Sequence, residues 1–429
     1  MVSRQPGARA AVGGQPGARA AVGGQPGARA AVGGQPGARA GVSGQPGARA
    51  RVSGQPGVQT AVSGQPDARA AVSGHAYPWD VLGDPRFLDR ATRRVTLAAA
   101  YHSTRAATPL HPEHRIVDAQ WAALYRPVRQ VAWKGQDLRP LEPGWVSSAD
   151  SFGEAAALLK RAGHEVTAWI VLTHNTRLGT LRPDVAVVNC FGETYPYALC
   201  PAHAEVRDHA ATLAAEAVLD VDVDGVSLEA CGQMGVNHLG HHEKTEGAWS
   251  PETAGLLSIC CCTACRRAWD ADGLDQAEVV AALRAGTPSD ALLAALLAVR
   301  HRHTDMLRAQ VLAALRSLPV TLHAHPDPWA TGPSPGLTPT AADDVDALLV
   351  PCWQPGSAEL VRAAAGKGKP VDAYVTLLHP MDPAALVPHV RDLKAAGASR
   401  LSLYHLGLAP AWRQDLFASI AAAASLPRE

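Results

Sequence analysis

The residue types best suited to chemistry gather in one segment of the chain, from Asp224 to Cys265. The segment begins with the apolar run DGVSLEA, which carries the carboxylate of Glu229, and continues into a loop with the motifs HHEK and CCCTAC. A carboxylate at the end of a buried strand, followed by titratable groups and thiols, is unsuited to a hydrophobic core and typical of a site. We therefore expect the chemistry of this protein here.

Glu229 is the first candidate for a catalytic residue. Glycosidic cleavage uses two carboxyl groups, about 5 Å apart for retention of configuration and roughly 6.5 to 9.5 Å apart for inversion. Two residues compete as the partner: Glu243 in HHEK, whose pKa the neighbouring His and Lys would tune, and Asp327, which follows the next strand. The structural alternative for Glu229 is a salt bridge to Arg126 or to a histidine.

The motif CCCTAC is the second candidate site. Cys262 and Cys265 have the C-x₂-C spacing of zinc ligands, and Cys260 or a histidine from HLGHH would complete the set. There is no second C-x₂-C pair, so four thiolate ligands from this motif would require a tight turn at Cys260 or Cys261. Two roles stay open: a structural zinc, or small buried hydrophobic residues that anchor the loop. In both, the thiols shape the loop, and the predicted reaction requires no cofactor.

Eight apolar runs are the strand candidates that would position these residues. They start at Val95, Asp118, Val166, Asp224, Val320, Ala347, Val371 and Arg400. Helical patterns lie between most of them, which indicates a parallel sheet covered by helices. Eight units over about 340 residues favour a closed (β/α)₈ TIM barrel of the α/β class over an open doubly wound sheet. The open sheet usually has a Gly-rich turn after its first strand, where this chain has YHSTRAATP.

Polar and aromatic residues follow every one of these strands. In a (β/α)₈ barrel the carboxyl ends of the strands meet on one face, so these side chains predict a ligand-binding cleft. Aromatic residues make up only 5% of the chain, and their presence there suits the stacking of a sugar. Besides the carboxylates, the expected substrate-binding residues are Tyr101, Tyr125, His174, Asn175, His323, His325, Trp353, His379, Tyr404 and His405.

The first 74 residues are a decapeptide repeat of the form QPGARAAVGG. Each unit has too little apolar surface to offset the entropy of ordering it, so we expect a disordered low-complexity tail. The barrel is expected over residues 90–425, with a long loop at 231–274 after the fourth strand. One Arg per repeat is weak evidence for a nucleic-acid partner, and none is predicted.

Neither a secretory signal nor a membrane span is visible in the sequence. The N-terminus has no apolar run of about 7 to 15 residues before a cleavage site. The run LLAALLAV from Leu292 is shorter than the roughly 20 residues that cross a bilayer. We therefore expect a cytoplasmic protein with no membrane partner, and the sequence leaves its oligomeric state open.

The run from Trp169 to Cys265 resembles an uncharacterised actinobacterial group of Ala-rich proteins with a glycoside-hydrolase-like barrel. The resemblance rests on WIVLTHNTRLG, VVNCFGE, YALCPAHAEVRDHA, DGVSLEA, HHEK and LLSICCCTACR, and extends over roughly residues 90 to 410. It implies a (β/α)₈ fold and a catalytic acid at Glu229, and it supplies no substrate. CCCTAC departs from the group's commoner form, in which an aromatic residue separates the first two thiols.

Three functions are consistent with these observations. The leading hypothesis is a carbohydrate-active hydrolase that cleaves a glycosidic bond of a small-molecule or oligosaccharide substrate with paired carboxylates. The second is a metal-dependent, amidohydrolase-like hydrolase that uses strand-end histidines such as those of His323-Ala324-His325. The third is a sugar-binding barrel without catalysis. The sequence leaves open the sugar, the linkage and the stereochemical outcome.

Overall fold

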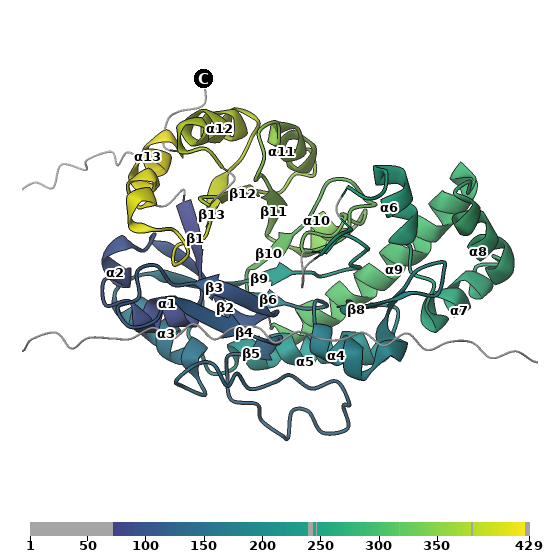
Figure 1. The fold of residues 1–429 in the computed structure, drawn as a ribbon, viewed down its shortest axis with the longest axis horizontal. Coiled ribbons are helices and arrows are strands. Elements are labelled where there is room, and N and C mark those ends of the chain that lie inside the picture. Colours follow the sequence, from purple (N-terminus) through teal and green to yellow (C-terminus); the bar gives the residue numbers. More distant parts are fainter. Residues whose placement is uncertain (1–71, 239–242, 246, 317, 379–380, 425–429) are drawn as a thin grey trace, which may run out of the picture. The chain divides into compact units, whose positions relative to one another are not determined.

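Eight parallel strands form a closed barrel at the centre of the molecule (Figure 1). The computed structural model describes residues 72–238, 243–245, 247–316, 318–378 and 381–424. The barrel strands are β1 (Val72–Ala76), β2 (Arg94–Tyr101), β6 (Glu165–Val171), β9 (Gly225–Glu229), β10 (Val320–His323), β11 (Ala347–Pro351), β12 (Val371–Thr376) and β13 (Arg400–Tyr404). Each strand pairs with the next, and β1 pairs with both β2 and β13, which closes the ring. The predicted (β/α)₈ fold is thus confirmed.

The first barrel strand is β1, and here the sequence-based prediction was wrong. Residues 72–74 were expected to end the disordered tail, and the barrel was expected to start at residue 90, but β1 begins at Val72. The run from Asp118, expected as the second barrel strand, instead contributes to β4 (Ile116–Ala119) and β5 (Ala123–Leu124). β4 forms a hairpin with β3 (Thr104–Ala107), and β5 pairs with β2 in antiparallel orientation. The rest of the repeat tail, residues 1–71, lies outside the described residues.

Helices follow each barrel strand. They are α1 (Pro78–Gly83) and α2 (Phe87–Arg90) after β1, α3 (Ser151–Arg161) after β2, α4 (Thr176–Leu181) and α5 (Ala204–Val218) after β6, α6 (Pro251–Leu257), α7 (Thr263–Ala271), α8 (Gln276–Ala285) and α9 (Asp290–Ala314) after β9, α10 (Ala341–Asp344) after β10, α11 (Ala358–Ala365) after β11, α12 (Pro383–Ala395) after β12, and α13 (Asp415–Ala424) after β13. Within the described ranges no single helix is long and apolar enough to cross a membrane. α8 and α9 reach that length and hydropathy only as a pair, and the pair is bent by 115°.

Local sequence explains where several helices begin and end. α3 starts after Asp150, whose side chain accepts a hydrogen bond from the backbone N–H of Gly153, and α9 starts after Ser289, which accepts from Leu292. α8 ends at Gly286, where φ is 73°, a left-handed conformation that glycine adopts without strain. The strands are rich in Val, Leu and Ala and almost fully buried, because a parallel barrel covers both faces of its sheet.

The long loop after β9 packs against a second hairpin that precedes α5. This hairpin consists of β7 (Ala186–Val188) and β8 (Thr194–Leu199). The Tyr195 hydroxyl donates to the carbonyl of Leu257 at 2.8 Å, and the backbone N–H of Cys261 donates to the carbonyl of Val188 at 2.6 Å. The loop expected at 231–274 therefore contains α6 and α7 and is attached to the hairpin at two points.

Charged residues hold the strand starts at the opposite end of the barrel. Arg94 pairs with Glu165 at 2.6 Å, and Arg400 pairs with Asp372 through two contacts of 2.8 Å. Asp224 accepts a hydrogen bond from the backbone N–H of Val166. Because these groups satisfy one another, this end of the barrel is structural, as is typical of the amino-terminal face of the fold.

Gly74 provides a test of the β1 assignment. A methyl group on its Cα would lie 2.6 Å from the buried side chain of Leu406. We expect Gly74→Ala to lower the free energy of unfolding by about 1–3 kcal/mol because it overpacks the barrel. Chemical denaturation measures this, with Gly144→Ala as the control, since a Cβ there would meet no atom within 4 Å. Equal stability of the two variants would contradict the position of β1.

Candidate functional site

Aromatic and titratable side chains from seven barrel strands, or from the residues directly after them, meet at the carboxyl ends of the strands. His75 packs against Trp169 and against Tyr374, with ring centroids 4.6 Å apart in both pairs, and Tyr101 lies 4.5 Å from Trp169. We call this group the mouth cluster. Its members are His75, Tyr77, Tyr101, Trp169, Glu229, His323, Tyr374, Tyr404 and His405.

Glu229 is the buried carboxyl of this cluster. It ends β9, and its side chain accepts a hydrogen bond at Oε2 from Nε1 of Trp169, at 2.8 Å. The same oxygen lies 3.7 Å from Nδ1 of His323. Burial raises the pKa of Glu229 to about 8, and the Trp169 hydrogen bond opposes this shift. Glu229 therefore keeps its proton at neutral pH, as a general acid must.

The histidines around Glu229 are neutral. Burial lowers the pKa of His323 and of His405 to about 3, and burial together with the neighbouring histidines lowers that of His75. His323 shares a hydrogen bond of 2.9 Å between its Nε2 and the Ser227 hydroxyl. Nδ1 of His323 and Nε2 of His75 and of His405 have no hydrogen-bond partner within the described part of the chain. Such buried polar atoms are costly, and a bound polar molecule would satisfy them.

A cavity of about 590 Å³ lies beside the mouth cluster, within the size range of small-molecule sites. Trp353, with 40% of its surface exposed, stacks on Tyr404 at 5.1 Å. Tyr374 belongs to both the cavity wall and the mouth cluster, whereas Glu229, only 4% exposed, does not line the cavity. The cavity is lined from two sides. Strand ends and the loop after β10 contribute His325, Asp327, Trp329, Trp353 and Tyr374, and the loop after β9 contributes Asn237, Ala254, Gly255 and Ser258.

The two candidates for the second carboxylate have different positions. Asp327 is exposed and borders the cavity, where Oδ1 accepts from the backbone N–H of Trp329 at 2.9 Å. Glu243 is half-buried, does not line the cavity, and accepts a hydrogen bond from the Thr245 hydroxyl, which lowers its pKa. His241 and His242 of the same motif lie outside the described residues. The geometry thus favours Asp327.

Several residues expected at the site have other positions. Asn175 caps α4 by accepting from the backbone N–H of Leu178 at 3.0 Å, and Tyr125 follows β5 rather than a barrel strand, with its hydroxyl 3.3 Å from Nε1 of Trp145. Each of these side chains therefore makes a hydrogen bond that stabilises the fold. His174 lies at the rim, where its Nε2 is 2.8 Å from Nε2 of His238. His379 lies outside the described residues.

The residues that β1 brings to the site were not predicted from the sequence. His75 and Tyr77 join the mouth cluster, and Asp80 is buried nearby, with Oδ2 3.7 Å from Nδ1 of His405. Asp80 accepts from the backbone N–H of Tyr77 at 2.8 Å, which caps α1, and burial raises its pKa to about 7. The available signal was HAYPWD at 75–80, a polar and aromatic run directly after the repeats.

The strand-end histidines do not form a metal centre in the described ranges. His323 is bound to Ser227, and Nδ1 of His325 accepts from the backbone N–H of Asp327 at 3.1 Å. Among the residues that the structure describes, one group of His, Cys, Asp and Glu is close enough to share a metal ion, and it consists of cysteines. Within the described residues, no group of strand-end histidines that could hold a metal supports the amidohydrolase-like alternative.

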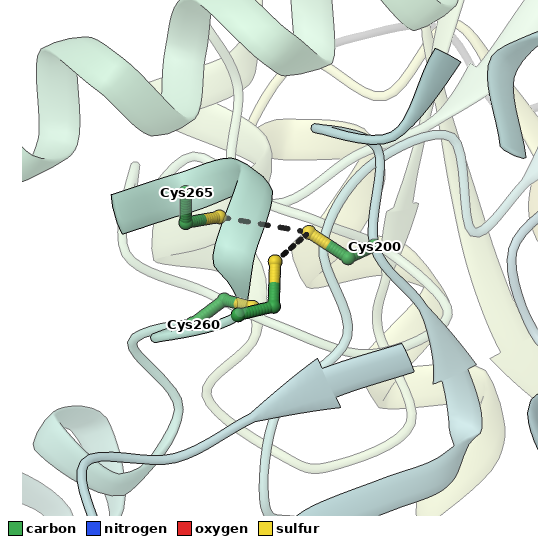
Figure 2. Close-up of side chains that lie close together, drawn as sticks. Cys200, Cys260 and Cys265 are labelled. Atoms are coloured by element: carbon green, nitrogen blue, oxygen red, sulfur yellow. Dashed lines mark hydrogen bonds between the residues drawn. The ribbon is translucent and has the colours of Figure 1, made fainter. Parts of the chain in front are cut away.

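Cys260, Cys262 and Cys265 do come together, as expected, and a fourth residue joins them. Figure 2 shows Cys200, which directly follows β8, pointing toward the same centre. Cys261 is directed elsewhere, with its Sγ 3.6 Å from the carbonyl of Ile259. The sequence left open whether the set would be completed by a further cysteine of the motif or by a histidine from HLGHH, and the fourth member of the observed group is Cys200.

Comparison with known proteins finds the same fold in two solved enzyme structures. No family model and no curated protein sequence matches the chain. Its fold is similar to that of alpha-L-fucosidase isoenzyme 2 from Paenibacillus thiaminolyticus, with a TM-score of 0.52 and 14% identity over 82% of this chain and 49% of that one. It is also similar to the catalytic domain of beta-amylase from Paenibacillus polymyxa, with a TM-score of 0.50 and 12% identity over 83% of this chain and 98% of that one.

The fold is therefore a (β/α)₈ barrel similar to those of these two enzymes. This chain spans about half the length of the fucosidase and nearly all of the amylase domain. At these identities the likeness is one of fold, so the role of each side chain must be argued from the site itself.

The protonation of Glu229 predicts how stability depends on pH. A carboxyl whose pKa is raised by folding stabilises the folded state least at high pH, so its contribution is lost as pH rises from about 4.5 through 8. Glu229→Gln removes this loss. We expect the variant to gain stability relative to the native chain between pH 5 and 8, by an amount on the order of a few kcal/mol.

Denaturant unfolding at several pH values measures this gain. Glu243→Gln is the control, because the pKa of Glu243 is lowered and its titration lies below this range. A difference between Glu229→Gln and the native chain that does not change with pH would contradict the buried, protonated state of Glu229.

Proposed function

We propose that this protein is a hydrolase that cleaves a glycosidic bond at the carboxyl face of its barrel. The observation that carries the proposal is a buried, protonated carboxyl, Glu229, beside a cavity lined by Trp353, Tyr374 and a second carboxylate, Asp327. A raised pKa is what a general acid needs at neutral pH, and two carboxyl groups are the usual requirement for glycosidic cleavage. The fold shared with the fucosidase and the amylase domain is compatible with this chemistry.

Glu229 is assigned the role of general acid. Its proton passes to the glycosidic oxygen while the bond from that oxygen to the anomeric carbon breaks. The Trp169 indole N–H, already 2.8 Å from Oε2, then stabilises the carboxylate that remains. His323 keeps its neutral form and stays available as a hydrogen-bonding group next to the same oxygen.

Asp327 is assigned the role of second carboxylate. It is exposed to solvent, and it borders the cavity in which the sugar would bind. Either it takes a proton from a water molecule that attacks the anomeric carbon, or it attacks that carbon itself, and the new bond replaces the one to the leaving oxygen. In the second route a water molecule that gives its proton to Glu229 then displaces Asp327 and releases the sugar. Glu243, which does not line the cavity, is the alternative for this role.

Aromatic rings next to polar groups favour a carbohydrate as the substrate. Trp353 presents 40% of its surface, and Trp329 and Tyr374 complete the aromatic part of the cavity wall. Indole and phenol rings pack against the apolar faces of sugars, whose hydroxyls would reach His325 and Asn237. An oligosaccharide fits this arrangement because Trp353 belongs to the cavity wall and is also exposed to solvent.

Substitution of the two carboxylates tests these roles. We expect Glu229→Gln to lower kcat by about 10²- to 10⁴-fold on glycosides with poor leaving groups. The loss should be smaller on aryl glycosides with good leaving groups, which need less proton donation. Asp327→Asn should impair both substrate types. Both variants should bind sugar with nearly native affinity, as measured by calorimetry.

Glu243→Gln is the matched control and should turn over substrate at nearly the native rate. Native turnover by Glu229→Gln on both substrate types would remove Glu229 from the mechanism. Loss of activity in Glu243→Gln, with native activity in Asp327→Asn, would transfer the role of second carboxylate to Glu243.

A sugar-binding barrel without catalysis is the second candidate. It is favoured by the burial of Glu229, which is only 4% exposed and does not contribute to the cavity wall. In that case glycans would bind without turnover, and Glu229→Gln would change neither affinity nor rate. In both cases we expect Trp353→Ala to weaken binding by about 1–2 kcal/mol, roughly 5- to 30-fold, because it removes the exposed stacking surface.

A further inference from the structure

Four buried cysteines from two separate parts of the chain meet at one point. Cys200 directly follows β8, Cys260 and Cys262 precede α7, and Cys265 lies in the first turn of α7 (Figure 2). The four sulfur atoms lie within 4.8 Å of one another, and each of the four residues is at most 6% exposed. Four thiols converging at this distance form a compact set of soft ligands.

The sulfur distances match one tetrahedral metal ion. Sγ of Cys200 lies 3.6 Å from that of Cys265 and 3.8 Å from that of Cys262, whereas a disulfide has its sulfurs about 2.05 Å apart. Zinc holds thiolates at about 2.3 Å, and the sulfurs of a tetrahedral site are then roughly 3.8 Å apart. The observed set is therefore preorganised for a single ion.

We propose that Cys200, Cys260, Cys262 and Cys265 bind one zinc ion in a closed structural site. Four protein ligands leave no coordination position for water or substrate, so the ion is assigned no part in a reaction. The motif is C-x-C-x-x-C with a distant fourth ligand, and Cys261, inside the same run of sequence, is excluded from it.

The surroundings supply the groups that such a site needs beyond its ligands. Nε2 of His203 lies 3.3 Å from Sγ of Cys262, close enough to donate a hydrogen bond to a metal-bound thiolate. Arg207 donates to the carbonyls of Pro201 and Ala202, which fixes the turn between Cys200 and His203. Cys262 is the N-cap of α7, where the helix dipole favours negative charge.

The site would join the β7–β8 hairpin to the wall of the cavity. α6 ends two residues before Ile259, and Ala254, Gly255 and Ser258 from this helix and its end line the cavity. The carbonyl of Ser258 accepts from Nε2 of Gln233 at 2.6 Å, and its hydroxyl accepts from the backbone N–H of Val236 at 3.0 Å. Zinc bound just beyond this segment therefore fixes one side of the cavity.

Metal analysis of the full chain tests the proposal. Expressed with zinc in the medium and dialysed against metal-free buffer, the native chain should retain about one zinc per molecule by elemental analysis. A colorimetric chelator should remove zinc far more readily from Cys200→Ser and Cys265→Ser. Cys261→Ala, altered in the same buried run of cysteines, is the control and should retain zinc as the native chain does.

Cobalt substitution of the native chain gives a measurement that needs no variant. We expect visible absorption bands typical of tetrahedral cobalt with thiolate ligands, and their loss when zinc is added back. Removal of zinc should also lower the unfolding temperature of the native chain and of Cys261→Ala alike.

Three results would overturn the proposal. They are a native chain without stoichiometric metal, iron in place of zinc at the same stoichiometry, and disulfides between these cysteines in the purified protein. Loss of zinc from Cys261→Ala, with retention in Cys200→Ser, would also contradict the assigned ligands. None of these measurements depends on enzymatic activity, so the proposal stands or fails independently of the proposed function.

Discussion

The closure of the barrel by β1 is the constraint on which the rest of the structure depends. β1 lies between β2 and β13, and the hydroxyl of Ser73 bonds to that of Ser402 at 3.0 Å across 329 positions of the sequence. The backbone N–H of Leu406 then donates to the carbonyl of His75. Only a closed ring brings the ends of all eight strands to one rim, so the mouth cluster exists because this short strand completes it.

Desolvation at that rim gives the site its chemical character. Glu229 and the histidines around it are all pushed toward their neutral forms by burial, one by a raised pKa and the others by lowered ones. The cluster thus combines many hydrogen-bonding groups with little formal charge. Asp327, in contrast, is exposed and borders the cavity, and two carboxyl groups with contrasting environments are what acid and base roles require.

Much of the fold followed from the sequence because seven barrel strands are strongly apolar runs between helical patterns. β1 was missed because its first residues repeat the tail: AVSG occurs at 61–64 and again at 71–74. The two copies differ only in the residues after them, since His75-Ala76 replaces the Gln-Pro of the earlier units. The run from Asp118 was misassigned because apolar composition alone does not distinguish a hairpin from a barrel strand.

Some residues of the candidate sites could be predicted from local sequence, and others could not. Glu229 was found because a carboxylate at the end of a buried strand is a local signal. Asn175 is likewise a polar residue that follows a buried strand, but its side chain caps a helix. Cys200 was missed because its partner Cys262 is 62 positions away. Such long-range contacts leave no spacing pattern to recognise in a single sequence.

That separation also sets the length of chain that the proposed ion would cross-link. Cys200 and Cys262 are 62 positions apart, and α5 and β9 lie between them. A metal clip that closes a loop of this length restricts the unfolded chain and so favours the folded one. The proposed zinc would therefore stabilise the strand and the helix inside the loop as well as the wall of the cavity.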